Sequence, residues 1–148
     1  MTKKFFVSLM SLLLITALLV GCGSRPSTLR EYMDANPGEW AEAQADAEAE
    51  AAQMSALYGV ELTATFEIVG NHELRMNFQF PDPAFLITTD VGAGLAAGLE
   101  ESLDMETDFY TELAGNMRSA MRIDTLYYSV RYLDANGSVL AERTFAGQ

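Results

Sequence analysis

Cysteine and histidine, the residues that supply thiolate and imidazole ligands and thiol nucleophiles, are scarce in this chain of 148 residues, which has one cysteine, Cys22, and one histidine, His72. A single cysteine excludes an intramolecular disulfide. One histidine without cysteine partners cannot build a typical zinc site, and no known signature places a serine or cysteine nucleophile beside it. We therefore expect no metal ion and no cofactor, and we interpret His72 as a solvated turn residue.

Positive charge is also scarce, because nine Lys and Arg stand against 21 Asp and Glu and give a formal net charge of −12. Such a surface repels the phosphates of nucleic acids, so we expect no nucleic-acid partner. An acidic surface favours cations or basic partners, but it is also what keeps many exported domains soluble.

The first 21 residues have the layout of a secretory signal peptide. Lys3 and Lys4 form a positive n-region, and an uncharged, mainly apolar run extends from Phe5 to Val20. That run has 16 residues, whereas a membrane-spanning helix needs roughly 20. We predict that residues 1–21 direct export and are then removed.

The segment Leu19-Val20-Gly21-Cys22 matches a lipobox. Small Gly21 fits a signal peptidase, and cleavage between Gly21 and Cys22 leaves Cys22 to carry an S-linked diacylglycerol and an N-acyl chain. The alternative is an ordinary signal peptide that ends near a cysteine. The lipobox predicts attachment to the outer face of the cell membrane, or to the outer membrane if the host has two, because Gly23 rather than Asp follows Cys22.

Removal of 21 residues, including Lys3 and Lys4, leaves 127 residues with a net charge of −12 − 2 = −14. This length is typical of one domain. We divide the chain into a signal peptide (1–21), a lipidated tether (22–27) and a single α+β domain (28–148).

Two helices are predicted at the start of the domain. Thr28 and Glu31 resemble a capping box ahead of a short helix, which Asn36-Pro37-Gly38 ends. An alanine-rich second helix is predicted from about Glu39 to Leu57. The low complexity from Ala41 to Ala52 leaves a flexible linker as the alternative.

Alternating apolar and polar residues predict two β-hairpins. The predicted strands are Val60 to Ile68 and Leu74 to Phe80 in the first hairpin, and Leu126 to Leu133 and Val139 to Phe145 in the second. Gly70-Asn71 and Asp134-Ala135-Asn136-Gly137 provide the turns.

One long amphipathic helix is predicted between the hairpins, from about Thr89 to Arg122. Its apolar residues shift phase near Met105, and a break near Gly115-Asn116 is an alternative. The predicted fold is therefore α+β: two N-terminal helices, then ββαββ, with a four-stranded antiparallel sheet packed on one side against the long helix.

A glycine cluster resembles a phosphate-binding loop only superficially. Gly92-Ala93-Gly94 with Gly98 lacks the spacing of a dinucleotide fingerprint and the lysine of a P-loop, although Phe85 to Ile87 could be a strand before it. We interpret these small residues as allowing the start of the helix to approach the sheet closely.

Two acidic features resemble cation sites. Asp134 to Val139 is similar to the middle of an EF-hand loop, but Tyr132 and Arg143 occupy the first and last ligand positions, so we predict a hairpin turn. One face of the long helix carries Glu101, Asp104, Asp108 and Glu112. We interpret this face as solvated, with weak binding of divalent cations as the alternative.

Aromatic residues of the predicted sheet are the remaining candidates. Tyr127, Tyr128 and Tyr132, with Phe78 and Phe80, could form a binding surface if one sheet face is open. We favour core and cross-strand packing for them. Both alternating sets of the second hairpin contain apolar residues, so the sequence leaves its buried face undecided.

Several segments together resemble a known family. The lipobox is followed by Ser27 to Tyr32 and a proline, by the strand Val60 to Ile68, by the helix Leu95 to Met105 and by the ending Val130 to Ser138. This pattern resembles short lipoproteins, mainly of Gram-positive anaerobes, that share a domain of unknown function. The resemblance covers nearly all of the mature chain. The resemblance implies surface attachment. It does not indicate any particular activity, and it provides no catalytic residues to carry over.

These observations leave two main functional hypotheses. The first is a membrane-anchored extracytoplasmic lipoprotein that acts as a non-enzymatic binding or interaction module; its partners are the membrane, through Cys22, and a protein or small molecule that the sequence does not identify. The alternative is a cell-envelope hydrolase with a site assembled from scattered Asp, Glu, Tyr and His72. An accessory subunit of a membrane complex is a third hypothesis.

Overall fold

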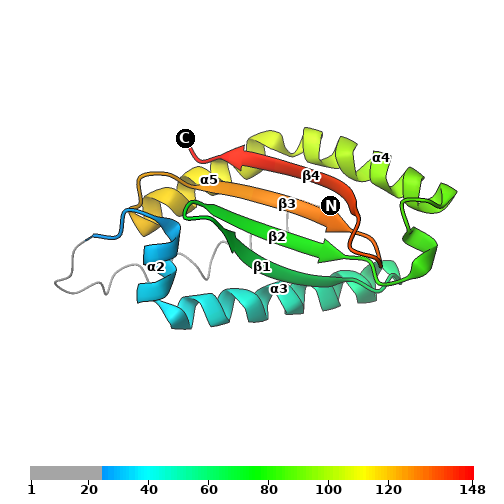
Figure 1. Ribbon diagram of the computed structural model, residues 1–148, viewed down its shortest axis with the longest axis horizontal. Coiled ribbons are helices and arrows are strands. Elements are labelled where there is room, and N and C mark those ends of the chain that lie inside the picture. Colours follow the sequence, from blue (N-terminus) through cyan, green and yellow to red (C-terminus); the bar gives the residue numbers. More distant parts are fainter. Residues whose placement is uncertain (1–24) are drawn as a thin grey trace.

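A computed structural model describes residues 25–148 as a four-stranded sheet with four α-helices and one short 3₁₀ helix (Figure 1). The elements are α2 (Leu29–Ala35), α3 (Pro37–Tyr58), β1 (Thr63–Val69), β2 (Glu73–Gln79), η2 (Pro83–Phe85), α4 (Asp90–Met105), α5 (Thr107–Met121), β3 (Tyr127–Leu133) and β4 (Val139–Ala146). The predicted signal peptide, the Gly21–Cys22 cleavage site and the lipid acceptor Cys22 lie outside the described residues.

The capping box of the first helix is confirmed. The Glu31 amide donates to Thr28 Oγ1 at 3.1 Å, and the Thr28 amide donates to Glu31 Oε2 at 3.3 Å. These bonds satisfy amides that the first turn of a helix leaves free. The helix α2 ends at Ala35, directly before Asn36-Pro37-Gly38, as predicted.

The alanine-rich segment is a helix rather than a linker. α3 begins at Pro37, two residues before the predicted start, because a proline is well accommodated in the first turn. It ends at Tyr58, where Gly59 adopts a φ of 67° that favours glycine. The buried residues Ala43, Ala47 and Ala51 recur every four positions, so their small side chains bring α3 close to β1.

The sheet is mixed, so the prediction of a purely antiparallel sheet is wrong at its centre. Its order is β1-β2-β3-β4, and both predicted hairpins pair antiparallel. β2 and β3 run parallel, with Glu73 opposite Tyr127 and Gln79 opposite Leu133. Adjacent parallel strands require a crossover that returns the chain to the end where the first strand began. The helices α4 and α5 make this return (Figure 1).

The single long helix predicted from Thr89 to Arg122 is also wrong, because α4 and α5 meet at a break at Glu106. A straight helix of 16 + 15 = 31 residues would be about 46 Å long. A seven-residue strand is only about 23 Å long, so the break keeps the crossover beside the sheet. It coincides with the phase shift near Met105, whereas Gly115-Asn116 lies within α5.

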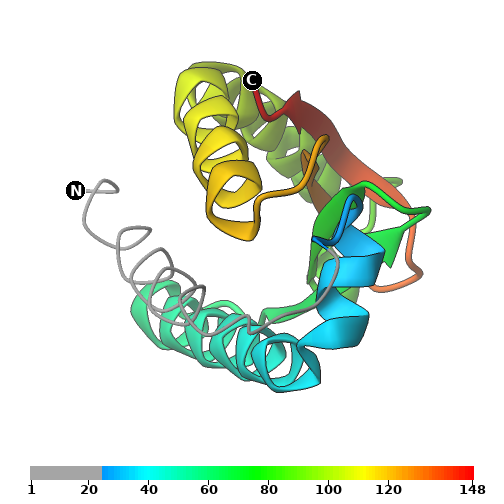
Figure 2. The ribbon, with the colours of Figure 1, turned by 90° about the vertical axis from the view of Figure 1, so that its left-hand side faces the viewer.

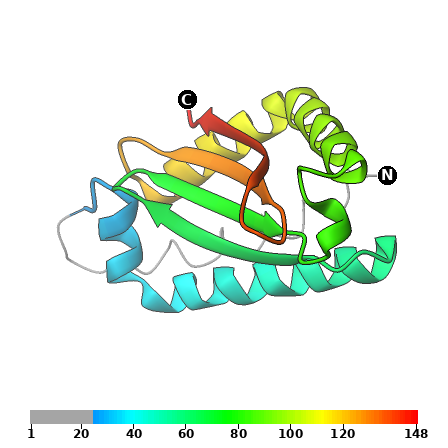
Figure 3. The same ribbon diagram turned by 45° about the vertical axis from the view of Figure 1, so that its right-hand side comes forward.

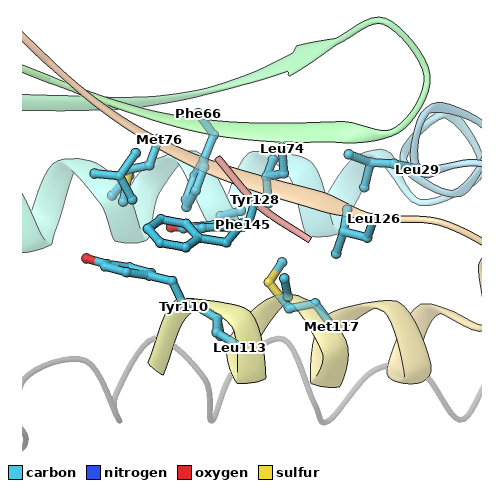
Figure 4. Close-up of a cluster of buried hydrophobic side chains, with 14 of the residues drawn as sticks. Leu29, Phe66, Leu74, Met76, Tyr110, Leu113, Met117, Leu126, Tyr128 and Phe145 are labelled. Atoms are coloured by element: carbon cyan, nitrogen blue, oxygen red, sulfur yellow. The ribbon is translucent and has the colours of Figure 1, made fainter. Parts of the chain in front are cut away.

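All the long helices lie on one side of the sheet. Figure 2 shows α3 along the β1 side and α4 with α5 along the β4 side. Figure 4 shows how α5 contributes to the core between these layers: Tyr110, Leu113 and Met117 point toward Tyr128 and Phe145 of the sheet. Among residues 25–148, no helix is both long enough and apolar enough to span a bilayer.

The segment from Phe85 to Ile87 is not the strand that the sequence allowed. Pro83–Phe85 forms the 3₁₀ helix η2, which lies at the same end of the molecule as the β3–β4 turn (Figure 3). Asp82 caps η2 by accepting from the Ala84 amide at 2.9 Å. A proline at the first position and a capping aspartate favour a helical turn over an extended strand.

Candidate functional site

The face of the sheet that the long helices leave uncovered carries a network of ions rather than a row of tyrosines. Arg75 lies 2.8 Å from Glu73 and 3.6 Å from Glu142, and Arg131 lies 3.0 Å from Glu142. Ser129, which is fully buried, donates to Glu73 at 2.5 Å. Because these charges and Ser129 link β2, β3 and β4 to one another, we assign this network to sheet stability.

The predicted aromatic residues divide between the two faces. Tyr127 lies on the uncovered face and is 42% exposed. Tyr128 and Phe78 are buried under the helices, and Tyr132 packs against the same core. Our preference for core packing is therefore confirmed for Tyr128, Tyr132 and Phe78.

Two aromatic stacks fill the helix-covered side. Tyr132 stacks on Phe78 at a centroid distance of 5.2 Å and lies 6.4 Å from Phe80. Tyr110 of α5 stacks on Phe145 at 4.8 Å and on Tyr128 at 5.9 Å. Stacking on neighbouring rings fixes the positions of the Tyr110, Tyr128 and Tyr132 side chains.

The carboxyl groups of Glu50 and Glu106 act electrostatically on these tyrosines. Burial raises the pKa of Tyr128 and Tyr132. The charge of Glu50 on α3 raises the pKa of Tyr128 further, and the charges of Glu106 and Glu50 raise that of Tyr132. Burial also raises the pKa of Tyr110, which forms a side-chain hydrogen bond with Glu106. We call Glu50, Glu106, Tyr110, Tyr128 and Tyr132 the tyrosine–carboxylate cluster; its phenols stay neutral at physiological pH.

Glu50 is the least satisfied member of the cluster. Its Oε2 is buried and has no hydrogen-bond partner among the described residues. Burial raises the pKa of its carboxyl group above 4.5, and the nearby charge of Asp46 adds to the increase. A partly desolvated carboxyl group beside neutral hydroxyls can accept a hydrogen bond, bind a cation or exchange a proton.

The sequence did not identify Glu50, Glu106 or Tyr110 as site residues. Glu50 lies four residues after Asp46 in a helix rich in acidic residues. No feature of the neighbouring sequence distinguishes it from the exposed acidic residues of the same helix. Glu106 marks the break between α4 and α5, which the sequence indicated only as a phase shift. The convergence depends on which faces of α3, α5 and β3 meet, and only the packing decides that.

His72 lies in the β1–β2 turn as predicted, but it is half-buried rather than fully solvated. Its carbonyl accepts from the Tyr127 amide at 2.8 Å, and its Nδ1 is buried without a partner among the described residues. No group of three or more His, Cys, Asp or Glu side chains in residues 25–148 is arranged to hold a metal ion.

In the glycine cluster only Gly92 makes a close contact, and that contact is with the segment after η2 rather than with the sheet. A Cβ on Gly92 would lie 1.9 Å from the Leu86 carbonyl oxygen, whereas one on Gly94 or Gly98 would meet nothing within 4 Å. Only Gly92 therefore requires the small residue that we predicted, and its neighbour is the segment after η2.

The EF-hand-like segment is a hairpin turn, as predicted, and its first residue is buried. Asp134 is 1% exposed. Its carboxylate accepts from the amides of Asn136 and Ser138, each at 2.9 Å, and from Ile87 at 3.1 Å. Asp134 therefore joins the β3–β4 turn to the segment between η2 and α4.

The four acids of the predicted solvated face are all exposed, but the helix break divides them. Asp104 forms an ion pair with Arg143, which also lies 3.5 Å from Glu100. Asp108 and Glu112 border an open hollow of about 330 Å³ near Gln148. Since no second feature of this hollow indicates a ligand, we keep the assignment to a solvated face.

No curated protein and no solved structure matches the chain. The sequence profile of one family, described as a domain of unknown function (DUF4854), matches residues 39–145. The match runs from the start of α3 to β4 and includes every member of the tyrosine–carboxylate cluster. It confirms the resemblance to a domain of unknown function, and the chain belongs to this family.

Proposed function

We propose that this protein is an exported lipoprotein, anchored at Cys22, whose domain is a non-enzymatic binding module with its ligand site at the tyrosine–carboxylate cluster. The observation that supports the site is the stacking of Tyr110 from α5 on Tyr128 from β3 at 5.9 Å, together with the buried Oε2 of Glu50 on α3 that has no partner among the described residues. Buried ionisable groups with shifted pKa values mark candidate functional sites.

The chemistry of the cluster favours an organic cation, such as a protonated amine or a quaternary ammonium group. Aromatic rings attract cations, and Tyr132 is the member of the cluster whose ring is only partly buried; the carboxylates of Glu50 and Glu106 provide the opposite charge. The net charge of −14 on residues 22–148 (−12 − 2) concentrates cations near the domain and repels anions. The neutral hydroxyls can accept hydrogen bonds from a protonated amine, whereas a quaternary ammonium group has no N–H and is attracted by charge alone.

Choline is a suitable probe, with its binding to the mature chain followed by NMR shifts of the tyrosine rings. We expect the shifts to appear on Tyr132 and Tyr128, and Glu50→Gln to weaken binding about tenfold, the loss of roughly one charge-assisted contact. Glu101→Gln removes an exposed acid from α4 and is the matched control, with no expected effect. Absence of shifts at millimolar choline, or equal losses in both variants, would contradict the proposal.

The anchor is tested independently by labelling cells with radioactive palmitate. We expect the label in the processed wild-type chain and none in Cys22→Ala, which should also fail to be processed. The mass of the N-terminal peptide should place both the diacylglycerol and the N-acyl chain on Cys22. An unlabelled mature chain that begins elsewhere would refute the anchor without affecting the ligand site.

One observation favours the alternative of a cell-envelope hydrolase. The raised pKa of Glu50, caused first by burial, is what a general acid requires. Incubation of the mature chain with peptidoglycan fragments tests this function. Release of new products that Glu50→Gln abolishes and Glu101→Gln preserves would replace the binding module with an enzyme.

A further inference from the structure

The chain enters the domain at one end of the sheet. The Arg25 guanidinium donates to the Arg122 carbonyl and lies 3.8 Å from Asp124, and the Asp124 amide donates to Ser27 at 3.2 Å. Arg30 then donates to the Gly70 carbonyl at 2.9 Å. Residues 25–30 are therefore held against the α5–β3 loop and the β1–β2 turn, which lie at the α2 end of the molecule (Figure 1).

This attachment point determines which end of the domain faces an anchored membrane. Only Gly23 and Ser24 separate Cys22 from Arg25, and three residues of extended chain span roughly 10 Å. The end formed by residues 25–36, 69–72 and 118–126, which we call the anchor end, must then lie close to the lipid headgroups. The far end contains residues 56–63, 80–94 and 133–139 (Figure 3).

Charge is distributed unequally between these two ends. The mature chain has 9 − 2 = 7 basic residues, and four of them, Arg25, Arg30, Arg118 and Arg122, lie at the anchor end. Three acids accompany them there, so its net charge is 4 − 3 = +1, while the remaining residues carry −15. The far-end segments contain no Lys or Arg and four acids: Glu61, Asp82, Asp90 and Asp134.

The arginines also differ in their partners. Arg75, Arg131 and Arg143, which lie outside the anchor end, each form ion pairs with carboxylates. Within residues 25–148, Arg118 and Arg122 have no carboxylate within ion-pair distance. Arg122 is exposed, and Arg118 precedes it by about one helical turn. The exposed charge of Arg122 is thus available for an external anion, and the half-buried Arg118, whose Nε is shielded from solvent, adds positive charge behind it.

We propose that the anchor end is a docking surface for anionic lipid headgroups, and that it holds the domain upright with its acidic far end away from the membrane. This inference rests on the proposed anchor at Cys22. Arginines within a Debye length of an anionic surface are attracted to it, and the far-end acids are repelled. An uncharged bilayer provides neither force, so there the domain is held only by its short tether.

Energy transfer from the full lipidated protein in vesicles measures this orientation. Asn71→Cys labels the anchor end and Asn136→Cys labels the far end, since Cys22 is blocked by lipid. α3, with 22 residues, is about 33 Å long, so the two labels lie at clearly different heights in an upright domain. With phosphatidylglycerol vesicles we expect strong transfer from position 71 to a headgroup acceptor and weak transfer from position 136.

The contribution of the arginines is tested by charge. We expect the difference between the two labels to shrink at least twofold in phosphatidylcholine vesicles, in high salt and in an Arg118→Gln/Arg122→Gln variant. The matched control, Glu101→Gln/Glu112→Gln, changes two exposed charges away from the anchor end and should preserve it. A difference that is independent of lipid charge and salt in the wild type would overturn the inference even if the variant does not fold. Loss of transfer from both labels would instead show that the anchor itself is absent.

Discussion

Asp134 and Glu50 are carboxyl groups partly or wholly removed from water, yet their pKa values move in opposite directions. Burial raises the pKa of Asp134, but hydrogen bonds from the amides of Ile87, Ser138 and Asn136 outweigh it, and its pKa falls below 3.8. Burial raises the pKa of Glu50, and its unpartnered Oε2 leaves that effect uncompensated. The number of donors that each carboxylate finds decides the direction.

Asp134→Ala should destabilise the protein by about 3 kcal/mol, because it leaves backbone amides without acceptors in a buried position. Asn136→Ala, at an exposed position of the same turn, should cost far less. Urea unfolding measures both variants. A cost for Asp134→Ala no larger than that of Asn136→Ala would show that the carboxylate does not hold the turn and the η2–α4 segment together.

The lowered pKa of Asp134 also predicts a dependence on pH. Its folded-state pKa lies below the ordinary 3.8, so its stabilisation is fully present above that value and disappears as the pH falls through the folded-state pKa. Hydrogen-bonded Asp134 should therefore contribute to acid unfolding. We expect the stability difference between wild type and Asp134→Ala to shrink below about pH 4, which unfolding curves at several pH values can measure.

The opposite sign applies to Glu50. Its folded-state pKa lies above the ordinary 4.5, so ionisation at neutral pH destabilises the folded state, and protonation at low pH removes this cost. Glu50→Gln should raise the melting temperature at pH 7 and leave it nearly unchanged at pH 4. Glu101→Gln is the control on an exposed surface. A lower melting temperature for Glu50→Gln at pH 7 would mean that the carboxylate has a stabilising partner.

At the scale of elements, the start of α4 depends on one close contact. The Thr89 side chain caps the helix by accepting from the Gly92 amide at 2.9 Å, and Thr89 Oγ1 donates to the Leu86 carbonyl at 2.8 Å. Gly92 lies against that same carbonyl. The cap and the glycine together connect η2 to α4 in the first part of the crossover.

Gly92→Ala should destabilise the protein by roughly 1–3 kcal/mol, because a Cβ there overlaps backbone atoms that have little room to move. Gly94→Ala, where a Cβ meets nothing within 4 Å, should instead stabilise α4 by up to about 1 kcal/mol, the difference in helix propensity. Thermal unfolding compares the pair. Equal effects would mean that the contact at Gly92 relaxes easily.

At the scale of the whole molecule, the excess of negative charge opposes folding. The mature chain has a net charge of −14, from −12 − 2, and repulsion among these charges is stronger in the compact state than in the unfolded chain. Adding sodium chloride screens this repulsion. We expect the melting temperature to rise by several degrees between low salt and ~0.5 M salt, as calorimetry can show, whereas a decrease would mean that attractive ion pairs dominate.

The sequence by itself determined the features that depend on near neighbours. The capping box at Thr28, the turns at Gly70-Asn71 and Asn136-Gly137, and the alternation of both hairpins concern residues within a few positions of each other. Each of these features is confirmed. Local propensity and hydrophobic periodicity decide them before the chain becomes compact.

Only the tertiary structure decided how these elements combine. The parallel pairing of β2 with β3 follows from where α5 ends, and that position depends on the break at Glu106. The tyrosine–carboxylate cluster combines Glu50 of α3 with groups of the α4–α5 junction, α5 and β3 that follow it by at least 106 − 50 = 56 positions. A period in the sequence indicates that an element has an apolar face, but which other element covers that face depends on the packing of the entire domain.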